Sequence, residues 1–108
     1  MLKAITAHVL FDGEHYLEQH ALVFDHTGIL EITPIDKLDS SADLISYGDA
    51  IITPGFIDIQ VNGGGGKMFN SDPRASSVST IAAAHRQYGT TGIFPTLITD
   101  DFTVMNLA

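Results

Sequence analysis

Residues 54–66 read Pro-Gly-Phe-Ile-Asp-Ile-Gln-Val-Asn-Gly-Gly-Gly-Gly, and no other part of the chain carries as clear a pattern. Successive residues of a strand point to opposite faces, so an alternating sequence separates apolar from polar side chains. The apolar face would hold Ile57, Ile59 and Val61, and the polar face Asp58, Gln60 and Asn62. Glycines at 63–66 permit positive φ angles and close backbone approach. The pattern predicts a strand whose polar face lines a site, followed by a loop beside it.

The sequence after this strand predicts a βαβ unit. Helical spacing relates Val78, Ile81, Ala82, His85 and Tyr88, with Ser76 or Ser77 as the expected N-cap and Gly89 after the helix end. A parallel strand is expected over residues 92–98, where Pro95 would interrupt the hydrogen-bond ladder with a bulge. A second helix is expected to start at Thr99 or Asp100. The fold class predicted for this part is α/β.

Residues 1–53 differ in rhythm and predict short strands separated by turn signals such as Asp12-Gly13 and Thr27-Gly28. We expect these strands to form a meander, with the odd-numbered residues of the first strand facing the core; these are Ile5, Ala7, Val9 and Phe11. A small sheet of this kind needs a covering layer, so further strands are expected from elsewhere. The change of rhythm at Thr53-Pro54-Gly55 predicts a domain boundary, with domains over 1–53 and 54–108.

Composition excludes several functional classes. The chain has 108 residues, 44% hydrophobic and 17% charged, which is typical of a globular protein. The formal net charge is -8 with five Lys plus Arg, which argues against nucleic-acid and anionic-membrane partners. There is no cysteine, hence no disulfide or thiolate metal site, as is usual in a reducing cytoplasm. Neither a signal peptide nor an apolar run of about 20 residues is present, and we expect a cytoplasmic location.

The glycines before Lys67 suggest a phosphate-binding loop, but the spacing does not fit. A Walker loop needs glycine where Val61 stands and Ser or Thr where Met68 stands, and a dinucleotide fingerprint needs glycine at Met68. Two interpretations remain for residues 63–66, a flexible turn between strand and helix or a loop that lines a site.

The polar residues of the strand also allow two interpretations. An unpaired buried polar group costs roughly 1–3 kcal/mol, so Asp58, Gln60 and Asn62 should have partners. They form either a hydrogen-bonded plug or, for Gln60 and Asn62 at the strand end, part of a site. Neutral amides cannot act as general bases and bind zinc more weakly than imidazole or carboxylate, so they would orient water or substrate. The histidines show no His-x-His pair, and surface or strand-edge roles are expected for them; they are His8, His15, His20, His26 and His85.

The motifs resemble a known enzyme family. Thr53-Pro54-Gly55-Phe56-Ile57-Asp58 resembles the barrel entry of the amidohydrolase superfamily, where a metal-binding His-x-His often follows. Here Gln60-Val61-Asn62 stands in its place. The run from Pro54 to Asn70 and the later Phe94-Pro95-Thr96-Leu97-Ile98-Thr99 resemble the N-terminal part of the N-acetylglucosamine-6-phosphate deacetylase family. One departure is Gly64, where related sequences often have cysteine.

The resemblance implies a fold and an activity. Residues 1–53 would be the N-terminal part of a small β-sandwich, and 54–108 the first two β/α units of an incomplete (β/α)8 TIM barrel. The whole enzyme would hydrolyse N-acetylglucosamine 6-phosphate to glucosamine 6-phosphate and acetate, with one divalent metal, expected to be zinc, per subunit of a homodimer. A closed barrel takes about 250 residues, so the chain alone is expected to be an inactive fragment.

The resemblance also assigns the residues. Catalytic residues and metal ligands are expected outside these residues, so none is assigned within the chain. Gln60, Asn62, Gly63 and Gly64 are expected to line the pocket around the metal and its water. Two alternatives stay open: another amidohydrolase acting on cyclic amides, which normally retains His-x-His, and a non-catalytic scaffold module of the same superfamily.

Overall fold

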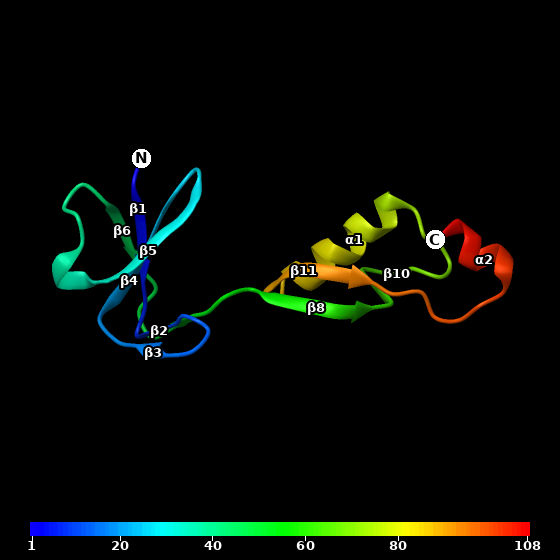
Figure 1. Cartoon of the computed structure of the whole chain (residues 1–108), viewed down its shortest axis with the longest axis horizontal. Helices are drawn as coiled ribbons and strands as arrows, with labels where there is room; N and C mark the ends of the chain where they lie inside the picture. The colour runs from blue at the N-terminus through cyan, green and yellow to red at the C-terminus, as the bar shows by residue number, and fades with distance from the viewer. The chain divides into compact units, whose positions relative to one another are not determined.

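The computed structural model describes all residues from Met1 to Ala108. The chain divides into two compact units, Met1–Pro54 and Gly55–Ala108, which are described separately. Both contain β-strands, and the second also contains α-helices, so the chain is a strand-rich mixture of α and β structure (Figure 1). No helix combines the length and the apolar character needed to span a membrane.

The first unit consists of short strands and one 3₁₀ turn. The strands are β1 (Lys3–Thr6), β2 (Val9–Phe11), β3 (Tyr16–Leu17), β4 (His20–Asp25), β5 (Gly28–Pro34), β6 (Asp43–Ser46) and β7 (Ile51–Ile52), and the turn η1 covers Ile35–Lys37. Short breaks separate consecutive strands, as between β1 and β2 and between β3 and β4. One break lies between β3 and β4, where Gln19 has a φ of 56°, a value that ends a strand.

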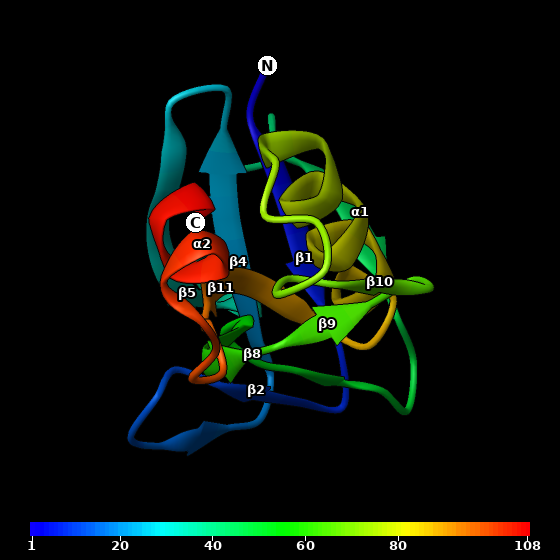
Figure 2. The ribbon, with the colours of Figure 1, turned by 90° about the vertical axis from the view of Figure 1, so that its right-hand side faces the viewer.

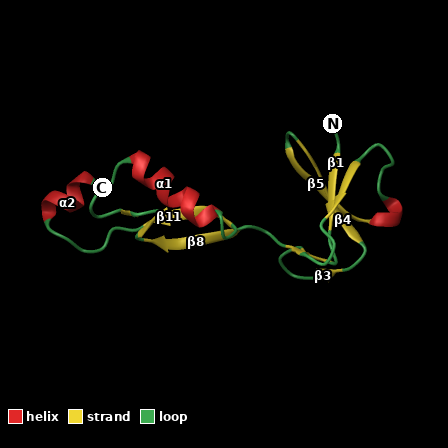
Figure 3. Cartoon of the chain, turned by 180° about the vertical axis from the view of Figure 1, so that it is seen from behind, coloured by secondary structure: helices red, strands yellow, loops and turns green.

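The strand order of the first unit differs from the predicted meander. One sheet has the order β5-β4-β1-β6, and β2 pairs in another sheet of order β3-β2-β7. Strand β1 lies between β4, to which it is antiparallel, and β6, to which it is parallel (Figure 1). Strands, drawn in yellow in Figure 3, make up the regular structure of this unit apart from one short helical turn. The meander was wrong because the chain leaves the first sheet after Thr6 and returns to it at β4.

The buried face of the first strand is the opposite of the predicted one. The core contains Ala4, Ala21 and Val23, against which Leu2, Ile35, Leu38 and Ala42 pack. Residues Ile35, Leu38 and Ala42 belong to the connection from β5 to β6, and the small Ala4 and Ala21 side chains leave room for that connection. The larger Ile5 is only partly buried. Side-chain volume, rather than hydrophobicity alone, thus determines which face is covered.

The second unit contains the predicted βαβ arrangement. Its elements are β8 (Phe56–Val61), β9 (Gly63–Gly64), β10 (Lys67–Met68), α1 (Ala75–Arg86), β11 (Thr90–Pro95) and α2 (Phe102–Leu107). Strands β8 and β11 are parallel, and α1 packs on β11 (Figure 1). The register shifts between Ile93 and Pro95, which confirms the predicted irregularity at this proline.

The helix starts differ slightly from those predicted. Helix α1 has Arg74 as N-cap, without a side-chain hydrogen bond, in place of Ser76 or Ser77. Gly89 follows its end with a φ of 94°, as predicted for a glycine after a helix. The N-cap of α2 is Asp101, whose side chain accepts a hydrogen bond from the backbone N–H of Val104. An aspartate at this position satisfies a free helix N–H, and its negative charge interacts favourably with the positive end of the helix dipole.

The core of the second unit covers only one end of β8. Val61 is 3% exposed and packs with Phe69 and Ile81, and Val78, Ile93 and Leu97 surround them. By contrast Ile57 and Ile59, on the same face of the strand, are 65% and 78% exposed. The strand is therefore held firmly at its C-terminal end, which is where the predicted site residues follow.

Candidate functional site

The predicted site residues lie at or just after the C-terminal end of β8. Gln60 is the penultimate residue of the strand and its side chain is exposed. Its backbone N–H donates a hydrogen bond to Asp58 Oδ1 (3.1 Å). The Gln60 amide is thus accessible to a ligand, since it is not covered by the rest of the unit.

The Asn62 side chain, by contrast, is hydrogen-bonded to the protein backbone. Its Nδ2 donates a hydrogen bond to the backbone oxygen of Thr96 (2.8 Å), and its own backbone oxygen accepts one from the N–H of Phe69 (2.8 Å). The backbone N–H of Thr96 in turn donates to Val61 O (2.8 Å). Asn62 therefore connects the end of β8 to the segment that follows β11. The hydrogen bond supports the interpretation of Asn62 as a hydrogen-bonded plug, and its place in a site stays a prediction.

Asn70 makes a second connection of the same kind. Its Nδ2 donates to the backbone oxygen of Ile98 (2.7 Å), and its Oδ1 accepts from the backbone N–H of Ile98 (2.8 Å). The Nδ2 atom also lies 3.0 Å from Asp100 Oδ2. This hydrogen bond, together with one from the backbone of Asp101, lowers the pKa of Asp100. The connection made by Asn70 was not predicted, because its partners are 28 and 30 residues away in sequence.

The four glycines form a small hairpin. Gly63–Gly64 (β9) pairs antiparallel with Lys67–Met68 (β10) beside α1 (Figure 2). Gly65 and Gly66 form the turn with φ angles of 58° and 76°. Positive φ at both central residues is what a tight type I′ hairpin turn requires, and glycine meets this at least cost. The segment is therefore an ordered hairpin packed on a helix.

Close approach explains the two glycines of β9. A Cβ atom on Gly63 would lie 2.5 Å from the backbone oxygen of Lys67, and one on Gly64 would lie 2.9 Å from His85 Nε2. The imidazole of His85 reaches from α1 and its Nε2 lies 2.9 Å from the backbone oxygen of Gly63. Sequence reasoning assigned His85 a surface or edge role, since only the helix spacing was visible.

A cluster of charged side chains lies just before α1. Asp72 accepts two hydrogen bonds from Arg74, at 2.6 Å from Nε and 2.8 Å from the terminal nitrogen. Lys67 Nζ is 3.5 Å from Asp72 Oδ2. The Arg74 guanidinium holds the pKa of Asp72 well below its usual range, and Asp72 raises the pKa of Arg74 in return. One aspartate thus pairs with both the lysine of the hairpin and the arginine before the helix.

The side chains of this chain do not fit a complete metal site. No group of three or more His, Asp or Glu side chains is arranged so that it could hold a metal ion. Gln60 and Asn62 offer neutral amide oxygens, which zinc binds less well than imidazole or carboxylate. Any metal bound beside Gln60 would need its principal ligands from other residues.

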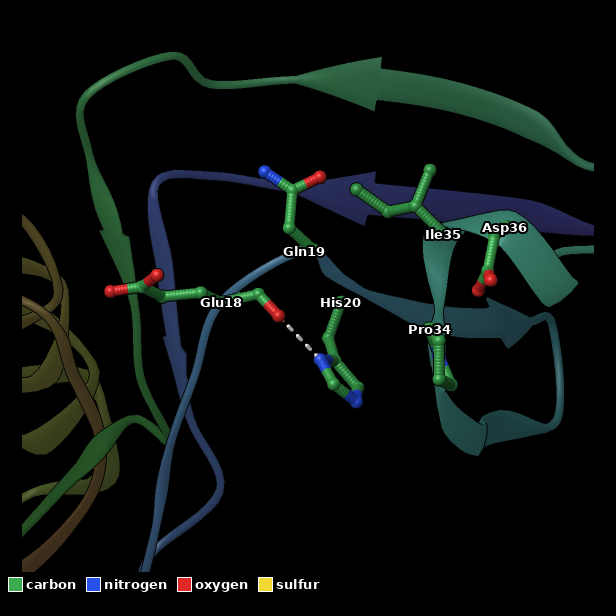
Figure 4. Close-up of a pocket in the computed structure, with 6 residues that line it drawn as sticks. All are labelled: Glu18, Gln19, His20, Pro34, Ile35 and Asp36. Atoms are coloured by element: carbon green, nitrogen blue, oxygen red, sulfur yellow. Dashed lines mark hydrogen bonds between the residues drawn. The ribbon is translucent and has the colours of Figure 1, made fainter.

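The first unit contains an open pocket of about 440 Å³ lined by Glu18, Gln19, His20, Pro34, Ile35 and Asp36. His20 Nδ1 lies 2.7 Å from the backbone oxygen of Glu18. In Figure 4 the carboxylates of Glu18 and Asp36 point away from one another, on either side of His20. These groups do not converge on a common point, so the pocket offers no organised set of ligands.

Known proteins are similar to this chain in both sequence and fold. The chain is 40% identical over 111 residues to an N-acetylgalactosamine-6-phosphate deacetylase of Shewanella sp. (strain ANA-3), and the match covers 100% of the chain. The chain is similar throughout to amino-sugar-phosphate deacetylases. It is also 28% identical, over 92% of its length, to the N-acetylglucosamine-6-phosphate deacetylase of Haemophilus influenzae. These matches cover 28% and 26% of the two relatives.

Structural comparison agrees with the sequence match to the deacetylases. The chain superposes on N-acetylglucosamine-6-phosphate deacetylase from Pasteurella multocida with a TM-score of 0.89 and 31% identity, over 98% of the chain and 28% of that protein. No protein-family model matches the chain. The predicted resemblance to this family is therefore confirmed, and the chain corresponds to the N-terminal part of the deacetylases, somewhat over a quarter of their length.

Proposed function

We propose that this chain is the N-terminal part of an amino-sugar-phosphate deacetylase, which hydrolyses an acetamide to an amine and acetate. The observation that carries the proposal is the full-length match of the chain to the Shewanella enzyme at 40% identity. The TM-score of 0.89 to the Pasteurella enzyme supports it independently. A non-catalytic scaffold with the same fold would also match in structure, so activity has to be measured.

Two sugars are candidate substrates. The motifs suggest N-acetylglucosamine 6-phosphate, and the Haemophilus and Pasteurella proteins carry that name. The Shewanella relative is named for N-acetylgalactosamine 6-phosphate, and its identity of 40% over the whole chain favours the second sugar. The two compounds differ in the orientation of one hydroxyl group. The proposed reaction, loss of the acetyl group, is the same for both.

In this proposal residues 54–108 supply the first two β/α units of a TIM barrel and residues 1–53 part of a β-sandwich. The parallel pairing of β8 and β11 around α1 supports the first assignment. Active sites of such barrels lie at the C-terminal ends of the strands, where Gln60 and Asn62 stand. Gln60, Asn62, Gly63 and Gly64 would line the site, with Gln60 free to orient water or substrate.

The remaining parts of the proposal lie outside the chain. One divalent metal per subunit, which we take to be zinc, would be bound by residues of the longer protein, because the side chains present here do not form a metal site. Such a metal supplies Lewis-acid activation of water and carbonyl groups. The proposal also includes a homodimer and a cytoplasmic location, as the resemblance implies.

The test is an assay of acetate release by the protein that carries this chain, in the presence of zinc, with each sugar phosphate in turn. We expect turnover of at least one sugar, with the larger kcat/KM identifying the substrate. Gln60→Ala should slow turnover or weaken metal binding. Gln87→Ala, at an exposed position after α1, is the matched control and should behave as wild type. Absence of acetate release from both sugars would favour a scaffold, and unchanged kinetics in Gln60→Ala would refute the role of Gln60.

A further inference from the structure

His85 connects helix α1 to the glycine hairpin through a hydrogen bond. Its Nε2 lies 2.9 Å from the backbone oxygen of Gly63, and the imidazole is partly buried. A carbonyl oxygen can only accept, so Nε2 must carry the proton that is donated. The bond joins residues 22 positions apart, from a helix to a strand of the hairpin. His85 therefore fixes where β9 lies on α1.

Gly64 and His85 are complementary in shape. A Cβ at position 64 would lie 2.9 Å from Nε2 and 3.2 Å from Cδ2 of the imidazole. The first distance is too short for a real contact, so any side chain at this position would displace the ring. Gly64 itself does not have a positive φ, so conformational freedom is not the reason for glycine at this position. The glycine is explained by the space that the imidazole takes.

The hydrogen bond acts on the residues proposed to line the site. Gly63 directly follows Asn62, whose Nδ2 is held by Thr96 O on the other side. The segment 62–64 is thus fixed from two directions, by the residue after β11 and by His85 of α1. Loss of the His85 bond would leave the segment held by Asn62 and by the pairing of β9 with β10, but without its hydrogen bond to α1.

We propose that His85 is a positioning residue of the deacetylase site, which acts through Gly63 and does not touch the substrate. The inference rests on the proposed function for its effect on catalysis, but the contact itself can be tested without activity. Misplacement of site residues by about 1 Å can reduce rates by about 100-fold, so even partial loosening of this segment should be measurable.

The test compares two conservative variants of the protein that carries this chain. In His85→Gln the amide nitrogen can take the place of Nε2, whereas in His85→Asn the shorter side chain cannot reach Gly63. We expect His85→Asn to lower kcat by roughly 10-fold with a smaller change in KM, because the effect is on orientation in the transition state. His85→Gln should recover most of the loss. His26→Leu, at an exposed histidine, is the control and should be unchanged.

Hydrogen exchange provides a measurement that does not depend on activity. Backbone amides of the peptide covering residues 62–70 should exchange faster in His85→Asn than in wild type and His85→Gln. As a second pair, Gly64→Ala should lower kcat by crowding the imidazole, and Gly64→Ala with His85→Ala should lose less than the sum of the two single changes.

The outcomes separate the two proposals. Equal exchange in wild type and His85→Asn would overturn the positioning role, whatever the activity. Faster exchange with unchanged kcat would also overturn it, since the hairpin would then be irrelevant to turnover. A wild-type protein that releases no acetate from either sugar would refute the proposed function and with it the catalytic consequence, and the exchange data would still show whether His85 holds the hairpin.

Discussion

The two units of the chain use polar side chains in different ways. In Met1–Pro54 aspartates accept hydrogen bonds from amides two or three residues ahead, as Asp12 does from Glu14 and His15. In Gly55–Ala108 the side chains of Asn62, Asn70 and His85 bond to backbone groups 34, 28 and 22 residues away. Local bonds shape turns, whereas distant bonds fix one segment against another. The distant bonds lie where the predicted site residues follow β8.

In the second unit, polar side chains thus hold the segments that follow β8 and β11 in place. The first unit does contain one distant side-chain bond, from Thr6 Oγ1 to the backbone oxygen of His20 (2.7 Å), but it lies inside a sheet. The variants below, all made in the protein that carries this chain, test this difference between the two units.

The largest effect is expected from Asn70→Ala. The change removes both hydrogen bonds to Ile98 and the one to Asp100, so we expect the free energy of unfolding to fall by about 2–3 kcal/mol in urea denaturation. Asn106→Ala, on the exposed side of α2, is the matched control. If the two variants were equally stable, the bond network around Asn70 would not hold the segment after β11.

A smaller effect is expected from Asn62→Ala, which removes one side-chain hydrogen bond and leaves Thr96 O without that partner. The free energy of unfolding should fall by about 1 kcal/mol. If the proposed function holds, kcat of the folded variant should also fall, because the loss of this bond loosens the end of β8. A loss of stability with full activity would restrict Asn62 to the structural role.

Asp72→Asn tests the charged cluster before α1 through its pH dependence. Arg74 lowers the pKa of Asp72 in the folded state below its ordinary value of 3.8. A group with a depressed folded-state pKa contributes stability that is fully present above the unfolded-state pKa and is lost as pH falls through the folded-state pKa. Wild type should therefore melt at a higher temperature than Asp72→Asn at pH 6, and the difference should shrink below about pH 3.8.

The control for this pair is Asp49→Asn, which makes the same substitution at an exposed turn and should melt at the wild-type temperature at pH 6. A gap between Asp72→Asn and wild type that stayed constant down to low pH would mean that the ion pair with Arg74 is not its source.

The smallest effect is expected from Asp12→Ala in the first unit. Two local hydrogen bonds to the backbone of Glu14 and His15 and a 3.6 Å contact with the His15 imidazole are lost, all at an exposed turn. Thermal melting should show the smallest decrease of the series. If the melting temperature fell as far as it does in Asn70→Ala, local and distant bonds would contribute equally to stability.

The same contrast explains what the sequence could predict. Strand β8, helix α1, parallel β11 and the irregularity at Pro95 follow from periodicity and turn chemistry, which are local properties. The strand order of the first unit and its buried face depend on which side chains leave room for the β5–β6 connection, and Ala4 gives no local sign of that. The roles of Asn70 and His85 depend on partners more than 20 residues away, so only a known family motif or the fold could show them.

The turn between β4 and β5 has a consequence for the order of folding. Asp25 pairs with Gly28 across a two-residue turn, so this hairpin closes a very short loop. By contrast, Phe56 can pair with Thr90 only after the long segment between β8 and β11 has closed into a loop. Because loop closure costs entropy before non-local contacts compensate for it, we expect the β4–β5 amides to gain protection first in pulse-labelled refolding. If the β8 amides were protected earlier, α1 would have to form first and so shorten the flexible loop between β8 and β11.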